Sequence, residues 1–137
     1  MKTRFVLDAW AILALLQREE PAASRVKQLL QETSKGSVDL FISIINLGEV
    51  YYSVGRVRGE RDALETLNSI RRLSLAVVPA TEEAVFKAAR FKMSYTISYA
   101  DAFAVATAEE LDAVLMTGDP EIEQLEDRIQ LEKLERR

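Results

Sequence analysis

Four acidic residues lie where a parallel sheet could gather carboxylates at one edge. Asp8 and Asp119 follow short apolar runs that are typical of buried strands, while Glu49 and Asp101 lie in early turns of expected helices. Clustered carboxylates repel one another unless a cation neutralises them. Because the sequence contains no histidine and no cysteine, oxygen ligands of this kind favour Mg²⁺ or Mn²⁺ over zinc. We therefore expect these four residues to hold such ions.

Each acid also has a simpler structural interpretation. Asp8 and Asp119 are natural helix N-caps, the second with a proline directly after it. Glu49 could lie on a solvated helix face. Asp101 could belong to a capping box with the serine three residues earlier, but its neighbours are small and apolar, and an isolated buried carboxylate is costly. Singly, only Asp101 requires a partner; the set of four is what favours a metal site.

Three polar neighbours and three arginines complete the candidate residues. Thr117 presents a hydroxyl at a strand end, and Asn46 precedes Glu49 by one helical turn, so both are expected to position carboxylates or phosphate. Ser43 could cap a helix or bind a substrate oxygen. Arginines often contact nucleic-acid phosphates. The candidates for that role, which could equally form a solvated helix end, are Arg56, Arg58 and Arg61.

Alternating short apolar runs and amphipathic segments indicate the elements that position these residues. Strands are expected at residues 5–7, 40–43, 75–78, 113–116 and, at an edge, 129–131. Helices are expected at residues 9–18, 21–35, 44–56, 60–73, 81–93, 99–111 and from 120. This order predicts an α/β fold of three α/β/α layers around a central parallel sheet, with ligands beyond the carboxyl ends of its strands. The stripe Leu64, Leu67, Ile70 and Leu73 should face the core, with an interface as the alternative.

Composition narrows the function further. The 137 residues predict one domain, and the net charge of −4 comes from 22 acids and 18 bases. Without the four candidate acids, the numbers of acidic and basic residues are equal, so the net charge does not exclude binding to nucleic acid. The apolar run at 5–16 is interrupted by Asp8, so we expect a cytoplasmic protein with no membrane span.

Other phosphate chemistries lack their motifs. A haloacid-dehalogenase-type phosphatase requires a second aspartate two residues after the first, where this chain has Trp10. The early acidic pair and late lysine of a receiver domain are not evident. The sequence has no P-loop and no G-x-G-x-x-G, so no nucleotide cofactor is expected.

The order and strand context of the motifs resemble the PIN-domain nucleases, in particular the small VapC toxins of toxin–antitoxin pairs. The likeness covers nearly the whole chain, although the segment 60–73 lies where such toxins vary. The matching motifs are Asp8 after its apolar run, Ser43-x-x-Asn46-Leu47-x-Glu49-Val50, Tyr99-Ala100-Asp101-Ala102 and Leu115-Met116-Thr117-Gly118-Asp119. The resemblance implies a PIN-like fold, RNA cleavage that depends on Mg²⁺ or Mn²⁺, a homodimer, and a cognate antitoxin that occupies the active-site groove.

A chain without histidine must generate its nucleophile in another way, and a water activated by a bound ion meets that need. Asp8, Asp101 and Asp119 are the expected ligands, and Glu49 is expected to ligate or to orient the water. The alternative is a catalytically idle domain of the same fold that binds RNA or a protein.

Overall fold

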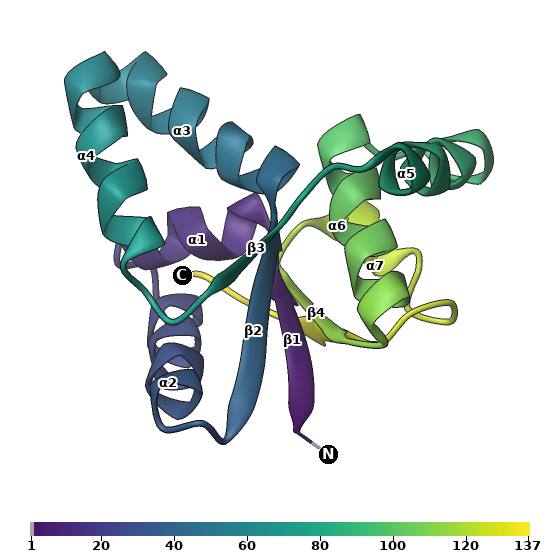
Figure 1. Ribbon diagram of the computed structural model, residues 1–137, viewed down its shortest axis with the longest axis horizontal. Coiled ribbons are helices and arrows are strands. Elements are labelled where there is room, and N and C mark those ends of the chain that lie inside the picture. The colour runs from purple at the N-terminus through teal and green to yellow at the C-terminus, as the bar shows by residue number, and fades with distance from the viewer. Residues whose placement is uncertain (1) are drawn as a thin grey trace.

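Short apolar segments form a five-stranded, all-parallel sheet in the computed structural model, which describes residues 2–137 (Figure 1). The strand order is β3-β2-β1-β4-β5. The bounds are β1 Thr3–Leu7, β2 Val38–Ser43, β3 Ala76–Val78, β4 Val114–Thr117 and β5 Leu131–Lys133. The first strand of the sequence is therefore the central strand of the sheet.

Successive residues of the central strands point to opposite faces of the sheet and enter two separate cores. Val6 and Leu115 belong to one core, and their neighbours Leu7 and Met116 belong to the other. All four side chains are fully buried. Because both faces are buried at these positions, successive residues are apolar, and the strands appear in the sequence as continuous apolar runs and not as alternating ones.

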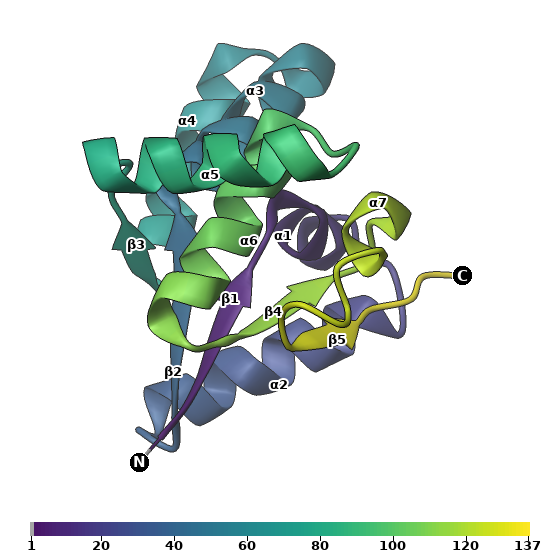
Figure 2. The ribbon, with the colours of Figure 1, turned by 90° about the vertical axis from the view of Figure 1, so that its right-hand side faces the viewer.

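Helices cover both faces. On one face lie α1 Ala9–Leu16 and α2 Ala22–Ser34, followed by the hairpin of α3 Ile44–Arg58 and α4 Glu60–Arg71. On the other face lie α5 Glu82–Ser94, α6 Tyr99–Leu111 and the short α7 Pro120–Glu123. Figures 1 and 2 show the sheet between these two groups. The predicted three-layer α/β/α architecture with a central parallel sheet is confirmed.

Most predicted boundaries differ from the structure by one or two residues, and two features need correction. The edge strand lies at Leu131–Lys133 and not at 129–131, because Ile129 packs into a core before the strand begins. The apolar stripe of α4 enters the core only in part: Ile70 is 3% exposed, whereas Leu64 is 50% exposed. Half of that stripe therefore lies at the surface.

The carboxyl ends of β1 and β4 form the switch point of the sheet. The chain leaves β1 towards β2 on one side and leaves β4 towards β5 on the other. Parallel sheets bind ligands in the crevice that such a reversal creates. Asp8 directly follows β1, and Asp119 lies two residues beyond β4, so both acids are located there.

In the part of the chain from residue 2 onward, no helix combines the length and apolarity needed to cross a membrane.

Candidate metal centre

Asp8 is a helix cap and also a buried acid. One carboxylate oxygen accepts a hydrogen bond from the Ala11 backbone at 2.9 Å, which caps α1, and the other accepts from the Thr117 hydroxyl. Asp8 is only 1% exposed. Burial raises its pKa from 3.8 to about 7, and the charges of Asp119 and Glu49 act in the same direction. The cap interpretation is correct but does not account for the burial of this carboxyl group among other acids.

Thr117 connects the first acid to the last. Its fully buried hydroxyl donates to Asp8 and accepts from the Asp119 backbone N–H at 3.0 Å. Asp119 in turn caps α7, because its Oδ1 accepts from the backbone of Glu121 at 2.9 Å. A side-chain hydrogen bond between Thr117 and Asp8 thus joins the carboxyl ends of β1 and β4.

Asp101 lies in the first turn of α6, where the oxygen of Ser98 accepts from its backbone N–H at 3.1 Å. The expected capping interaction is therefore present. Asp101 is nevertheless only 7% exposed. Its pKa is raised from 3.8 to about 8, first by burial, then by direct contact with the carboxyl of Asp119 and by the negative charges of Asp119 and Asp8. The cap does not account for this crowding.

Glu121 was not anticipated from the sequence. Carboxylate oxygens of Asp101, Asp119 and Glu121 lie within 4.8 Å of one another, close enough for one cation to contact all three. The only sign of this role in the sequence is the position of Glu121 two residues after Asp119. However, acids in a first helical turn commonly only complement the helix dipole, so this signal is weak.

Glu49 is half-buried on α3, where burial raises its pKa, contact with Asn46 lowers it and the charge of Asp119 raises it again. Fully buried Asn46 donates from Nδ2 to the carbonyl of Ala100 at 3.0 Å, which ties α3 to the start of α6. Its buried Oδ1 has no partner within residues 2–137. Ser43 caps α3 by accepting from the Ile45 backbone at 3.2 Å.

The four predicted acids thus come together, since the pKa of three of them responds to charge on the others. The three arginines do not join them through any contact found in residues 2–137. Arg56 stacks on Tyr52 at 4.9 Å, and Arg61 pairs with Glu65 at 3.6 Å. Arg58 lines an apolar groove between α1 and the α3–α4 hairpin.

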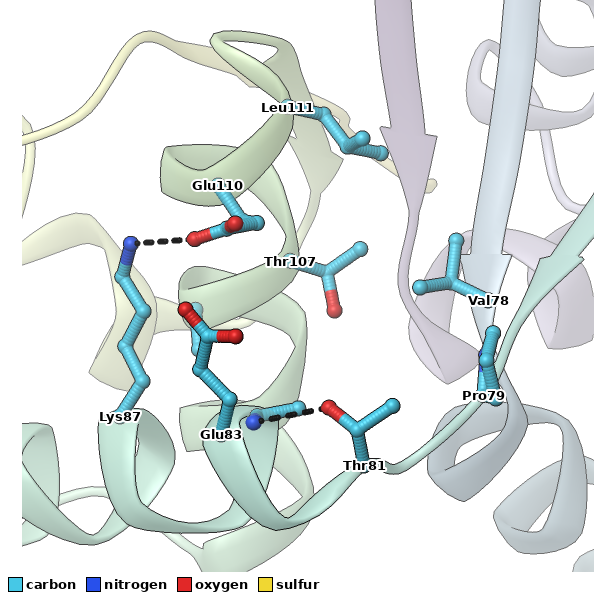
Figure 3. A pocket seen from close by; sticks show the side chains of 10 residues that line it. Val78, Pro79, Thr81, Glu83, Lys87, Thr107, Glu110 and Leu111 are labelled. Atoms are coloured by element: carbon cyan, nitrogen blue, oxygen red, sulfur yellow. Dashed lines mark hydrogen bonds and ion pairs between the residues drawn. The ribbon is translucent and has the colours of Figure 1, made fainter.

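The donor set fits Mg²⁺ or Mn²⁺. Every candidate ligand is a hard oxygen, and burial without a cation forces two carboxyls to hold protons near neutral pH. The acids converge at the switch point, away from a cavity of about 130 Å³ near the end of β3. Figure 3 shows that cavity, with Lys87 and Glu110 paired at its rim and no candidate acid in its lining.

Comparison with known proteins gives the fold a family. The PIN domain model matches residues 5–128. The search of curated proteins found no match.

Solved structures of toxin–antitoxin proteins share the fold. VapBC2 from Rickettsia felis, bound to a DNA fragment from its promoter, aligns with a TM-score of 0.74 at 15% identity and covers 97% of this chain and 100% of that one. VapBC-1 from nontypeable Haemophilus influenzae aligns with a TM-score of 0.71 at 20% identity and covers 96% of this chain and 98% of that one. VapC20 from Mycobacterium tuberculosis, a sarcin-ricin loop cleaving toxin, aligns with a TM-score of 0.64 at 16% identity. It covers 81% of this chain and 86% of that one. The match of the family model over nearly the whole sequence shows that this chain belongs to the PIN domain family.

Proposed function

We propose that this chain is a metal-dependent endoribonuclease that hydrolyses RNA phosphodiester bonds. The observation that carries the proposal is the cluster of Asp101, Asp119 and Glu121 carboxylates beside buried Asp8, at the switch point of a PIN-domain sheet. A centre of this kind needs cations to be fully ionised at neutral pH.

Each side chain has a distinct part in this proposal. Asp8, Asp101 and Asp119 hold the cation, with Glu121 as an additional oxygen donor at the exposed side. Glu49 ligates or orients the attacking water. When bound, Mg²⁺ or Mn²⁺ lowers the pKa of water and offsets the charge on the leaving oxygen.

Two uncharged residues hold those acids in place. Thr117 fixes Asp8 relative to the Asp119 backbone through its hydroxyl. Asn46 holds the helix of Glu49 against the helix of Asp101 through its bond to the Ala100 carbonyl. Ser43 begins α3 as its cap and does so through a backbone N–H, so we assign it a structural part. Partners of this kind orient ligands without contacting the substrate themselves.

The biological setting follows the structural relatives. The VapBC family is described as one of toxin–antitoxin systems, and VapC20 as a sarcin-ricin loop cleaving toxin. We therefore assign this chain the part of the toxin, acting in the cytoplasm on RNA as a homodimer and held inactive by a cognate antitoxin. Sedimentation of the purified chain tests the dimer, and co-purification of a tagged chain from its native cell tests the antitoxin.

Cleavage of mixed cellular RNA by the purified chain tests the activity. We expect fragments in Mn²⁺ or Mg²⁺ and none in chelator, because the carboxylates need a cation to act. Asp101→Asn should abolish cleavage. Asp112→Asn, at the opposite and exposed end of the same helix, is the matched control and should cleave normally.

Two results would contradict this assignment. Equal cleavage by Asp101→Asn and the parent would identify a contaminating nuclease. RNA binding without any cation-dependent cleavage would instead support the catalytically idle domain.

A further inference from the structure

Trp10 packs directly against the turn that carries Asp119. A Cβ placed on Gly118 would collide with three atoms of the indole ring, Cζ2, Cε2 and Cη2. The backbone of Gly118 does not have the positive φ that favours glycine. Within residues 2–137, the glycines with positive φ are Gly36 and Gly59. Glycine is therefore required at 118 by the ring and not by the backbone.

The ring joins the ends of β1 and β4, which are followed by Asp8 and Asp119. Trp10 follows Asp8 by two residues in the first turn of α1, and Gly118 lies between Thr117 and Asp119 after β4. Contact between them therefore fixes the distance between the start of α1 and the turn after β4, which are separated by more than a hundred residues in sequence. The buried hydroxyl of Thr117 links the same two segments through its hydrogen bonds with Asp8 and the Asp119 backbone.

Residues 134–137, which we name the strap, also contact the ring, through Arg136. Arg136 places its guanidinium 5.2 Å from the indole and pairs with Glu19 at 3.2 Å. The strap is anchored by backbone hydrogen bonds at both ends and along its length. These bonds are Leu134 N–H to Thr117 C=O at 2.8 Å, Ala22 N–H to Glu135 C=O at 3.0 Å and Arg137 N–H to Glu20 C=O at 2.9 Å.

We propose that Trp10, held by the strap, is a positioning residue that sets the place of Asp119 and thereby the Mn²⁺ affinity of the candidate metal centre. The inference rests on the proposed function and adds to it a residue that touches neither ion nor substrate. The ring acts on the one residue of the turn that has no side chain, so a small shift there moves the Asp119 carboxylate relative to Asp101. Metal affinity is sensitive to such orienting contacts by about ten- to a hundredfold.

A double-mutant cycle on Mn²⁺ binding tests the proposal, with free Mn²⁺ measured by electron paramagnetic resonance. Gly118→Ala should lower the affinity at least about tenfold, because the new methyl group displaces the turn from the ring. In the Trp10→Ala background the same substitution should cost much less, because the colliding ring is gone. Gly48→Ala, where an added Cβ meets nothing within 4 Å, is the matched control and should bind as the parent does.

The strap and the ring have independent readouts. Arg136→Ala should weaken Mn²⁺ binding by a smaller factor, and neighbouring Arg137→Ala should leave it unchanged. Trp10 is the only tryptophan of the chain, so its fluorescence should be quenched over the same Mn²⁺ concentrations that fill the site. Trp10→Phe, which keeps an aromatic ring, should recover part of the affinity lost in Trp10→Ala.

The outcomes separate this inference from the proposed function. If the parent binds Mn²⁺ and the variants at 10 and 118 bind it equally well, or if their costs simply add, Trp10 is not a positioning residue although the metal centre stands. If the parent binds no Mn²⁺, both proposals fail. Should Gly118→Ala not fold, the double variant and the comparison of Trp10→Ala with Trp10→Phe still decide the question.

Discussion

Burial is the main reason why single carboxyl groups of this site hold protons near neutral pH. The pKa values of Asp8 and Asp101 are raised from 3.8 to about 7 and about 8. An unfolded chain releases the same protons near pH 4. Between these limits the native state binds more protons than the unfolded state. The contribution of these groups to stability is therefore full below about pH 4 and is lost as the pH rises through 7 and 8.

In chelator, the melting temperature should consequently fall as the pH is raised from about 6 to about 9. The chain has no histidine or cysteine to titrate in that interval. Asp101→Asn should flatten the decline and melt no lower than the parent at the alkaline end, because an amide does not repel its neighbours. Thermal unfolding followed by circular dichroism measures both. A marked destabilisation by Asp101→Asn would instead make Asp101 a structural cap.

Thr117 offers a second test at the residue scale. Thr117→Val keeps the shape but removes the hydroxyl, which leaves a buried oxygen of Asp8 and the Asp119 N–H without this partner. We expect a loss of about 1–3 kcal/mol in the free energy of unfolding, measured in urea without metal. Thr117→Ser keeps the hydroxyl and should lose much less. Equal losses for both variants would assign the effect to packing of the methyl group.

Sequence reasoning identified the four acids because each follows a recognisable strand or lies in an early turn of a helix. It could not find Glu121, whose approach to Asp101 depends on how α7 turns after Asp119. The contact of Trp10 with Gly118 was equally out of reach, because it joins residues far apart in sequence and leaves no periodic pattern.

At the scale of elements, the α3–α4 hairpin carries the arginines that were predicted to bind phosphate. They lie towards its tip, whereas Glu49 and Asn46 lie at its base next to α6. Arg56 follows Glu49 by two helical turns, which places it about 10 Å further along the same side of α3. A nucleic-acid strand leaving the metal centre along α3 would meet it, so its role in binding RNA stays a prediction.

RNA binding by the cleavage-deficient Asp101→Asn protein tests this prediction at several salt concentrations. Removing Arg56 or Arg58 should weaken binding and reduce the slope of log affinity against log salt by about 0.7 for each lost phosphate contact. Arg72→Ala, at the far end of α4, is the control and should change neither. An unchanged slope for Arg56 and Arg58 would mark them as a solvated helix end.

Element types were predictable from apolar runs, whereas some boundaries depend on tertiary contacts. β2 begins at Val38 because its backbone is in register with β1 from Thr3 onward, which no local pattern indicates. The edge strand β5 contains Glu132, which Arg25 on α2 holds with two hydrogen bonds of 2.7 and 2.9 Å. A charged strand residue supported from another layer cannot be recognised from a strand pattern.

At the scale of the whole molecule, the three-layer fold was predictable because alternating strands and helices permit few other arrangements. Cation binding should be visible in the stability of the whole domain. A ligand that binds only the native state raises the free energy of unfolding by about 2.7 kcal/mol at a hundredfold excess over its dissociation constant.

The rise in melting temperature with saturating Mn²⁺ should be larger at about pH 8 than at about pH 6, because protons on Asp8 and Asp101 compete with the cation. Differential scanning fluorimetry at both pH values measures this difference. Asp112→Asn should respond as the parent does, and Asp101→Asn should respond less. A rise that does not depend on pH would place the binding outside the cluster.

The central position of β1 also determines when the acids can meet during synthesis. Asp8 is made first, but its strand pairs with β4, and its carboxylate bonds to Thr117, which lies 109 residues further on. A nascent chain that stops before β4 therefore contains Asp8, Glu49 and Asp101 but not the carboxylate of Asp119. The ribosome must have finished residue 119 and released it from the tunnel before the cluster exists. The complete cluster can therefore form only after β4 and the turn that follows it have been made.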